Sequence, residues 1–178
     1  MKLTMKLLKK CIQGTYEIDE NGFVNVEGNV DLFSENLTSF GNIKFGKISG
    51  NFYCYYNNLT SLEGSPKYVG GEFYCYSNNL TSLEGSPKEV SGYFDCSYNK
   101  LTSLEGSPKY VGGNFLCYDN KLTSLEGSPK VVGGNFSCHT NNLTNFDLHC
   151  KVEGKIQSDQ ELNVKHPYSK EILRELLK

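Results

Sequence analysis

The sequence predicts a mostly β solenoid, in which each turn of the chain takes 21–22 residues and successive turns stack through a parallel β-sheet. The main observation is an internal repeat: the segment CYYNNLTSLEGSPKYVGG begins at Cys54, and near-copies follow at intervals of 21 residues. Apolar residues recur at fixed positions in each copy, and Pro and Gly recur between them. One such turn has too little apolar surface to offset its ordering entropy, so it needs neighbours to stack against.

Residues 1–27 are expected to form an N-terminal cap. Residues 5–12 have the pattern of a short helix, for which Thr4 is the expected N-cap. The segment TYEIDENGFVNVEG then alternates around Asn21-Gly22, which is typical of a β-hairpin. A solenoid needs such a cap because its first turn would otherwise leave one side of the core open.

Residues 28–148 contain the repeats. Each full unit reads Phe-x-Cys-x-x-Asn-x-Leu, as at Phe52, Cys54, Asn57 and Leu59. Four units match fully, and a fifth breaks off near Phe146. The first unit, at an offset of 22, is atypical because it has Leu and Glu where the others have Cys and Asn.

Two columns of the repeat are expected to build the fold. Cysteine is a small, readily buried side chain that suits a core position between strands about 4.8 Å apart. Asparagine at the end of each strand can bond otherwise unpaired backbone groups of its own and neighbouring turns. These predicted structural ladders are Cys54, Cys75, Cys96, Cys117 and Cys138, and Asn57, Asn78, Asn99, Asn120 and Asn141.

Residues 149–178 are expected to hold a decayed turn followed by a C-terminal capping helix. The helix begins near Pro167 or Ser169 in the segment HPYSKEILRELLK. Its apolar residues would lie on one face and cover the open end of the core, and docking to a partner is the alternative use of that face.

The unit resembles the consensus of the leucine-rich repeat, L-x-L-x-x-N-x-L, over residues 28–146. It is similar to the short repeats of bacterial type III secreted effectors, and more similar to small leucine-rich-repeat-like proteins of tailed bacteriophages, in which LTSLEGSPK units follow a VNVEGNVDL cap. The resemblance implies a leucine-rich-repeat solenoid with its parallel sheet on a concave face, a helix and hairpin cap at the N-terminus and a helix cap at the C-terminus. It does not imply the effectors' ligase activity, because the residues outside the repeats suffice only for caps.

Four outward columns of the repeat are expected on the concave face, since side chains alternate between core and surface along a strand. These columns vary from unit to unit, and they carry many aromatics, several acids and no Lys or Arg. Tyrosine offers a large contact area at a small entropy cost, which favours a binding face; the alternative is that the rings only pack on one another across strands. The predicted binding residues are Phe33, Tyr53, Tyr55, Tyr56, Glu72, Tyr74, Tyr76, Tyr93, Asp95, Tyr98, Leu116, Tyr118, Asp119 and His139.

The seven cysteines raise the alternatives of a metal site or disulfides. A straight ladder does not converge on a tetrahedral centre, which argues against metal. Adjacent strands lie within disulfide range, but parallel side chains in a core have poor dihedral options. We expect the ladder cysteines to be reduced and buried, and Cys11 and Cys150 to be the more reactive pair.

No catalytic residue, metal or cofactor is expected. The chain has three histidines, and only His139 falls in the outward columns. Ser137 is nearby in sequence, but no orienting group accompanies the two in a recognised nucleophile context. The chain also lacks a phosphate-binding or dinucleotide-binding glycine motif.

The composition and the N-terminal segment indicate which kinds of partner and which cellular compartment to expect. A net charge of −2 does not favour nucleic acid or an anionic membrane. The N-terminal segment has no continuous apolar stretch, so we expect a cytoplasmic protein whose four NLT sequons are by-products of the repeat.

These observations predict a non-enzymatic protein-binding module whose partner has basic residues at the contact. The resemblance to phage proteins implies an inhibitor or adaptor of a host protein, acting in the bacterial host cytosol. The alternatives are a binder of a small ligand, such as a nucleotide or a sugar, and a structural component of a larger assembly. Self-association through the aromatic face is a further alternative.

Overall fold

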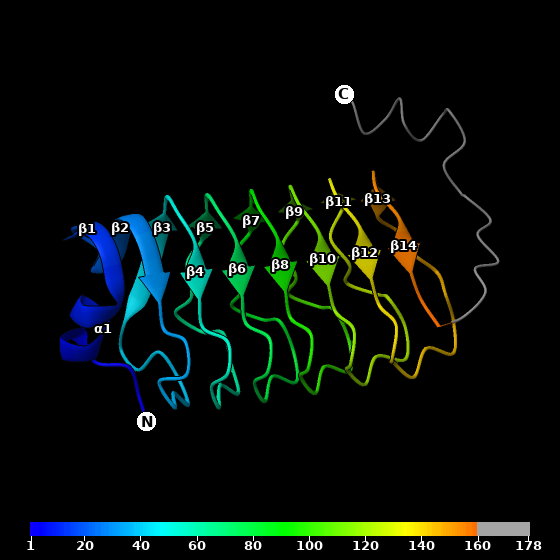
Figure 1. Cartoon of the computed structure of the whole chain (residues 1–178), viewed down its shortest axis with the longest axis horizontal. Coiled ribbons are helices and arrows are strands. Elements are labelled where there is room, and N and C mark those ends of the chain that lie inside the picture. Colours follow the sequence, from blue (N-terminus) through cyan, green and yellow to red (C-terminus); the bar gives the residue numbers. More distant parts are fainter. Residues whose placement is uncertain (160–178) are drawn as a thin grey trace.

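The computed structural model describes residues 1–159 of the chain. Two ladders of short parallel strands run side by side along the long axis (Figure 1). The first ladder consists of β4 (Phe52–Tyr53), β6 (Phe73–Tyr74), β8 (Phe94–Asp95), β10 (Phe115–Leu116), β12 (Phe136–Ser137) and β14 (Ile156–Gln157). The second consists of β3 (Lys44–Ile48), β5 (Tyr68–Val69), β7 (Glu89–Val90), β9 (Tyr110–Val111), β11 (Val131–Val132) and β13 (Lys151–Val152).

The long strand β2 (Phe23–Asp31) joins the two ladders. Its first half pairs with β3 and its second half pairs with β4, both in parallel. Each later turn of the chain adds one strand to each ladder, which confirms the mostly β solenoid with turns of 21 residues. The resemblance to the leucine-rich repeat implied a parallel sheet on one face, and the structure adds a second ladder from segments such as Tyr68–Val69. These segments lie outside the Phe-x-Cys-x-x-Asn-x-Leu motif, and two residues are too few to show an alternating pattern.

The N-terminal cap has the predicted elements. Helix α1 (Met5–Cys11) begins after Thr4, whose hydroxyl accepts a hydrogen bond from the Leu7 N–H at 3.3 Å. Strand β1 (Ile12–Ile18) then pairs with β2 in an antiparallel hairpin. At the other end, the decayed turn contributes β13 and β14, whereas the predicted capping helix lies outside the described residues.

The core consists of columns with one residue from each turn. Neighbouring phenylalanine rings of the first ladder stack with centroids 5.1–5.5 Å apart. The fully buried members of one representative turn are Phe52, Cys54, Leu59, Leu62 and Val69. Burial of each column in every turn supplies the apolar area that a single turn lacks.

The predicted asparagine ladder is confirmed, and Asn78 shows its geometry. Its Oδ1 accepts the Leu59 N–H of the preceding turn at 2.9 Å. Its Nδ2 donates to the carbonyl of Cys54 in the preceding turn and to that of Cys75 in its own turn, each at 3.0 Å. The same set of bonds recurs at Asn57, Asn99, Asn120 and Asn141.

All seven cysteines are free and buried. The burial expected for the ladder cysteines is therefore confirmed, and burial raises the pKa of each ladder thiol. That Cys11 and Cys150 are the more reactive pair stays a prediction, although both side chains are buried as well, at 6% and 4% exposed. Burial raises the pKa of Cys11 and raises that of Cys150 to about 12, so neither thiol is poised to ionise near neutral pH.

No helix among residues 1–159 is long and apolar enough to cross a membrane.

Asn57 and its neighbour Asn58 provide a test of the ladder. We expect Asn57→Ala to lower the free energy of unfolding by about 2–4 kcal/mol, because it leaves the Leu37 N–H and the Leu32 carbonyl without their buried partner. Asn58 is exposed, so Asn58→Ala should change the free energy of unfolding by less than about 0.5 kcal/mol. Urea denaturation of both variants measures the difference, and equal stabilities would contradict the role given to the ladder.

Candidate functional site

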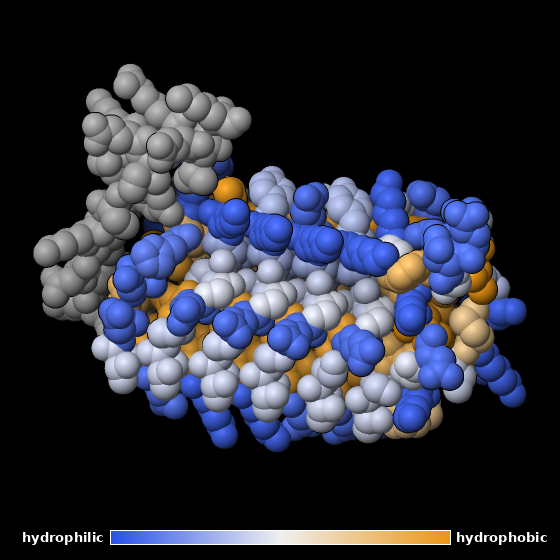
Figure 2. All heavy atoms as spheres, turned by 180° about the vertical axis from the view of Figure 1, so that it is seen from behind, coloured by the Kyte–Doolittle hydropathy of each residue, from blue (hydrophilic) through white to orange (hydrophobic). Residues whose placement is uncertain are grey.

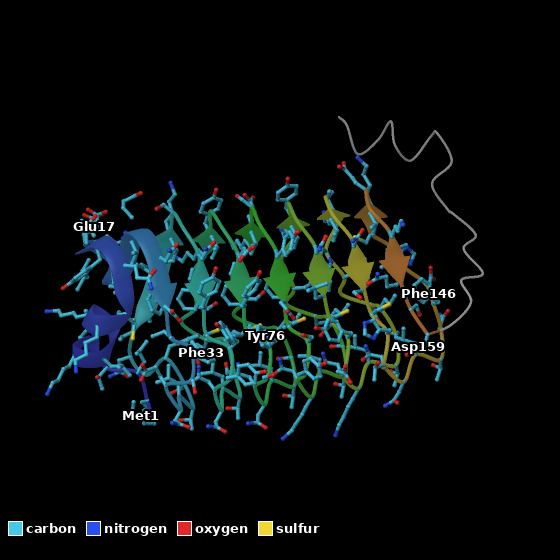
Figure 3. All side chains as sticks on the ribbon, in the orientation of Figure 1. Met1, Glu17, Phe33, Tyr76, Phe146 and Asp159 are labelled. Atoms are coloured by element: carbon cyan, nitrogen blue, oxygen red, sulfur yellow. The ribbon has the colours of Figure 1, made fainter. Side chains whose placement is uncertain are left out.

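The predicted binding residues gather on the outward surface of the first ladder and of the residues that follow each of its strands. We call this surface the tyrosine face. Figure 3 shows Phe33, Tyr76 and Asp159 in one row along the strand ends of this ladder. The row is the column formed by Phe33, Tyr55, Tyr76, Ser97, Tyr118, His139 and Asp159.

Six rings from the first turns form a continuous cluster. Tyr55 is at its centre: its ring stacks on Tyr76 at 4.6 Å and packs against Phe33 at 4.7 Å. Tyr53 and Tyr74 stack beside this column at 5.2 Å. The six-ring cluster is Phe33, Tyr53, Tyr55, Tyr56, Tyr74 and Tyr76, and its ring contacts lie between 4.6 and 6.3 Å.

Three rings from later turns form a second cluster. Tyr118 stacks on His139 with centroids 4.7 Å apart and packs edge-on against Tyr98 at 5.3 Å. The three-ring cluster of Tyr98, Tyr118 and His139 is separated from the first cluster by one position in the column, which Ser97 occupies. The tyrosine face thus has two groups of stacked rings with a gap of one ring between them.

The backbone turns the most exposed rings outward. The residue before each ladder asparagine has a positive φ, which is 52° at both Tyr56 and Tyr98. A non-glycine residue in this region is uncommon, and the asparagine bonds on either side of it fix the conformation. Tyr56 and Tyr98 are 56% and 52% exposed as a result. In the stacked column, Phe33 is exposed as well, whereas Tyr55, Tyr76, Tyr118 and His139 are half-buried.

Glu72 bridges two tyrosines of the six-ring cluster. Its Oε2 accepts a hydrogen bond from the Tyr53 hydroxyl at 3.1 Å. Burial, followed by this bond, raises the pKa of Tyr53 to about 12, and the same two causes raise the pKa of Tyr74. A tyrosine is protonated at the pH of a cell in any case, so the effect of the carboxylate is to orient the Tyr53 hydroxyl as a hydrogen-bond donor.

The column that contains Glu72 is mainly structural, which differs from the prediction of an exposed column. Asn51 lies half-buried at the corner, and its Oδ1 accepts the Glu72 N–H at 2.8 Å. A Cβ on Gly71 would lie 2.0 Å from this Oδ1, so the corner requires glycine. Asn29, Asn114 and Asn135 make the same bond to the next turn. Tyr93, in the same column, remains exposed.

Asp95 is not the exposed acid that the sequence predicted. It is 8% exposed, and its Oδ1 accepts the Ser97 N–H at 2.9 Å and the Ser97 hydroxyl at 2.5 Å. Ser97 is fully buried, and burial raises the pKa of Asp95 in spite of the two bonds from this serine. Side chains of neighbouring turns cover both residues. Leu116 and Asp119 beside them are half-buried.

Among residues 1–159, the side chain of His139 contacts Thr140 and Tyr118. Its Nδ1 lies 3.0 Å from the Thr140 hydroxyl and its ring stacks on Tyr118. The Ser137 hydroxyl donates to Gln157 at 2.9 Å instead of to this histidine. Among residues 1–159, no group of three His, Cys, Asp or Glu side chains is placed to hold a metal ion.

The side of the molecule opposite the tyrosine face has rows of charged side chains instead of clustered rings. Figure 2 shows rows of hydrophilic side chains that run parallel to the long axis. The repeats supply exposed rows of lysine and glutamate: Lys67, Lys88, Lys109 and Lys130, and Glu63, Glu84, Glu105 and Glu126. At the first turns, a hollow of about 610 Å³ has Phe23 on its wall, with the Lys67 Nζ 3.6 Å from the centre of that ring. This hollow is separate from the tyrosine face.

Comparison with protein-family models, with curated proteins and with solved structures finds no match for this chain. The relation to phage leucine-rich-repeat-like proteins therefore stays a prediction from the repeat motif.

The bridge at Glu72 has a measurable consequence. In Glu72→Gln, we expect the pKa of Tyr53 to fall from about 12 towards the ordinary value near 10, because the negative charge beside the phenol is removed. Carbon-13 shifts of the labelled tyrosine rings, followed by NMR against pH, measure each midpoint. Tyr76 provides the unchanged reference, because burial raises its pKa and Glu72 is not among the causes. An unchanged Tyr53 midpoint would show that burial alone causes the shift.

We expect the carboxyl group of Asp95 to lower the free energy of unfolding at neutral pH. Because burial raises its pKa in the folded state, the unfolded state loses this proton first as the pH rises above about 4, and folding becomes less favourable. Asp95→Asn keeps an acceptor for Ser97 and cannot ionise, so we expect this variant to be more stable than the wild type at pH 7 and nearly equal to it at pH 3.5.

Urea denaturation at the two pH values measures the effect. Asp119→Asn, at a half-buried acid of the same face, is the control and should show a smaller difference. A variant Asp95→Asn that is less stable than the wild type at pH 7 would mean that the folded protein already compensates the charge.

Proposed function

We propose that this chain is a non-enzymatic protein-binding module that uses the tyrosine face. The observation that carries the proposal is the six-ring cluster, in which Phe33 and Tyr56 are 47% and 56% exposed on a ladder of fixed backbone. Clustered, exposed aromatic side chains on a rigid scaffold are characteristic of protein-binding surfaces.

The packing of the rings favours binding. Each ring of the stacked column touches its neighbours at 4.6–4.7 Å, so its rotamer is restricted before a partner arrives. A restricted ring loses little entropy when it is covered, and its hydroxyl remains available for polar contacts. The tyrosines can therefore pack on one another across strands and also form a binding face, because the same ring contacts stabilise the fold and restrict the rotamers.

The charges of the face indicate the kind of partner. As far as the turn of β12, its columns contain Asp31, Glu72, Asp95 and Asp119 and no Lys or Arg, and the turn of β14 adds one acid, Asp159, and one base, Lys155. Opposite charges across an interface select the partner and speed its association, so the partner is a protein with basic residues at the contact. The resemblance of the repeats to phage proteins supports a role as an inhibitor or adaptor of a host protein.

Two exposed tyrosines provide the test. In Tyr56→Ser with Tyr98→Ser, each substitution introduces the residue that Ser77 supplies in the same column, where φ is 53°. We expect this double variant to fold with unchanged thermal stability and to lose its partner in an affinity capture from bacterial lysate, read by mass spectrometry.

The matched control removes two tyrosines from the second ladder, in Tyr68→Ser with Tyr110→Ser. Retention of a stoichiometric protein by this control and its loss from the face variant would support the proposal, and the affinity of the purified pair should then fall at least about tenfold in the face variant. Equal capture by both variants would place the contact elsewhere. Capture of no protein by the wild type would favour the small-ligand or assembly role.

A further inference from the structure

One turn of the tyrosine face departs from its neighbours. In the column of β4 and β6, Tyr53 and Tyr74 are followed by Asp95. Two residues later, in the stacked column, Ser97 stands where the flanking positions have Tyr76 and Tyr118. The turn that begins with β8 therefore replaces two rings with a carboxylate and a hydroxyl.

The carboxylate of Asp95 is buried without a counter-ion. It is 8% exposed, and within residues 1–159 no Lys, Arg or His nitrogen lies within 4.0 Å of it. Ser97 donates both of its hydrogen bonds to Oδ1. No described residue donates one to the other oxygen, which keeps some contact with solvent, because no fully buried side-chain oxygen of residues 1–159 lacks a partner. Burial of an ionised carboxylate with no cation is costly, and such local costs are typical of functional sites.

The missing ring leaves a position for one flat group. Neighbouring rings of the column are 4.6–4.7 Å apart, close to the spacing of parallel strands. Tyr76 and Tyr118 belong to turns on either side of Ser97, so their backbones are separated by two strand spacings, or about 9–10 Å. Ser97 is fully buried, which means that side chains lie over it in the free protein. A ligand at this position would have to displace the side chains that cover Ser97, and side chains at a surface reorient within nanoseconds.

We propose that this gap binds the guanidinium group of an arginine side chain on the protein partner, stacked between Tyr76 and Tyr118 and paired with Asp95. A guanidinium is flat, always charged, stacks on aromatic faces and donates in the plane to a carboxylate. An ammonium group has the charge but lacks the flat shape, so the gap selects arginine over lysine. The inference rests on the proposed protein-binding function and adds the residue that the partner must present.

Three tripeptides test the ligand chemistry. Acetyl-Gly-Arg-Gly-amide is compared with the lysine and citrulline analogues, of which the first keeps a charge without the flat group and the second keeps a flat group without the charge. Titration into the nitrogen-15-labelled full chain is followed by NMR. With the arginine peptide, we expect the amide signals of Ser97 and Tyr118 to shift and to saturate, with a dissociation constant in the millimolar range. The lysine peptide should bind at least about tenfold more weakly, and the citrulline peptide should not bind.

Two variants and a control test the site. Asp95→Asn should weaken arginine-peptide binding at least about tenfold, and Ser97→Tyr should abolish it by filling the gap with the ring that both flanking positions carry. Glu89→Gln removes one exposed negative charge from β7 on the other ladder and should bind like the wild type. Circular dichroism confirms that each variant is folded.

The outcomes separate this inference from the proposed function. Equal binding of the arginine and citrulline peptides, equal binding by Asp95→Asn, or no saturable shift at 20 mM peptide would overturn the arginine site. If Asp95→Asn still captured the protein partner at wild-type affinity while the Tyr56 and Tyr98 double variant lost it, the binding module would stand and the arginine site would fall.

Discussion

The fold depends on the amide side chain of one asparagine in each turn. At the end of every first-ladder strand the chain turns inward through a residue with positive φ, and the backbone groups at this corner cannot pair within a sheet. Asn78 satisfies groups of two turns at once, because its amide offers an acceptor and two donors in one plane. No apolar side chain can replace it, and a hydroxyl provides too few bonds.

The same constraint leaves the outward columns free to vary. Because the asparagines and the buried columns fix the position of each turn, an outward side chain can change without moving the backbone. Its neighbours in the column always lie one strand spacing away, which is the distance at which aromatic rings stack. A face built in this way is rigid where rings follow one another, as from Phe33 to Tyr76, and the run of rings is interrupted at Ser97, which neighbouring side chains cover.

The sequence predicted the features that repeat and missed those that depend on neighbours. The 21-residue period, the asparagine and cysteine ladders, the Thr4 cap and the hairpin all follow from local patterns. The second ladder was missed because its strands lie outside the Phe-x-Cys-x-x-Asn-x-Leu motif, which marks only the first ladder, although the strands of the two ladders that follow β3 are equally short. The burial of Asp95 was missed for a different reason: its strand position is outward, and only the bulk of side chains in adjacent turns covers it.

A comparison within the chain shows that the solenoid does not need a carboxylate at Asp95. Asp31 occupies the same column and its Oδ1 accepts the N–H of Phe33 two residues later at 3.1 Å, as Asp95 does for Ser97. Asp31 stays half-buried at the first turn, so its charge remains partly hydrated. The other turns fill this column with Tyr53, Tyr74, Leu116 and Ser137, none of which is charged, and their strands pair in the same register. Asp95 does have a local structural role, because its Oδ1 accepts both hydrogen bonds of Ser97. Since the backbone accepts uncharged residues at this position, the fold does not require the charge, and the proposed arginine site rests on that difference.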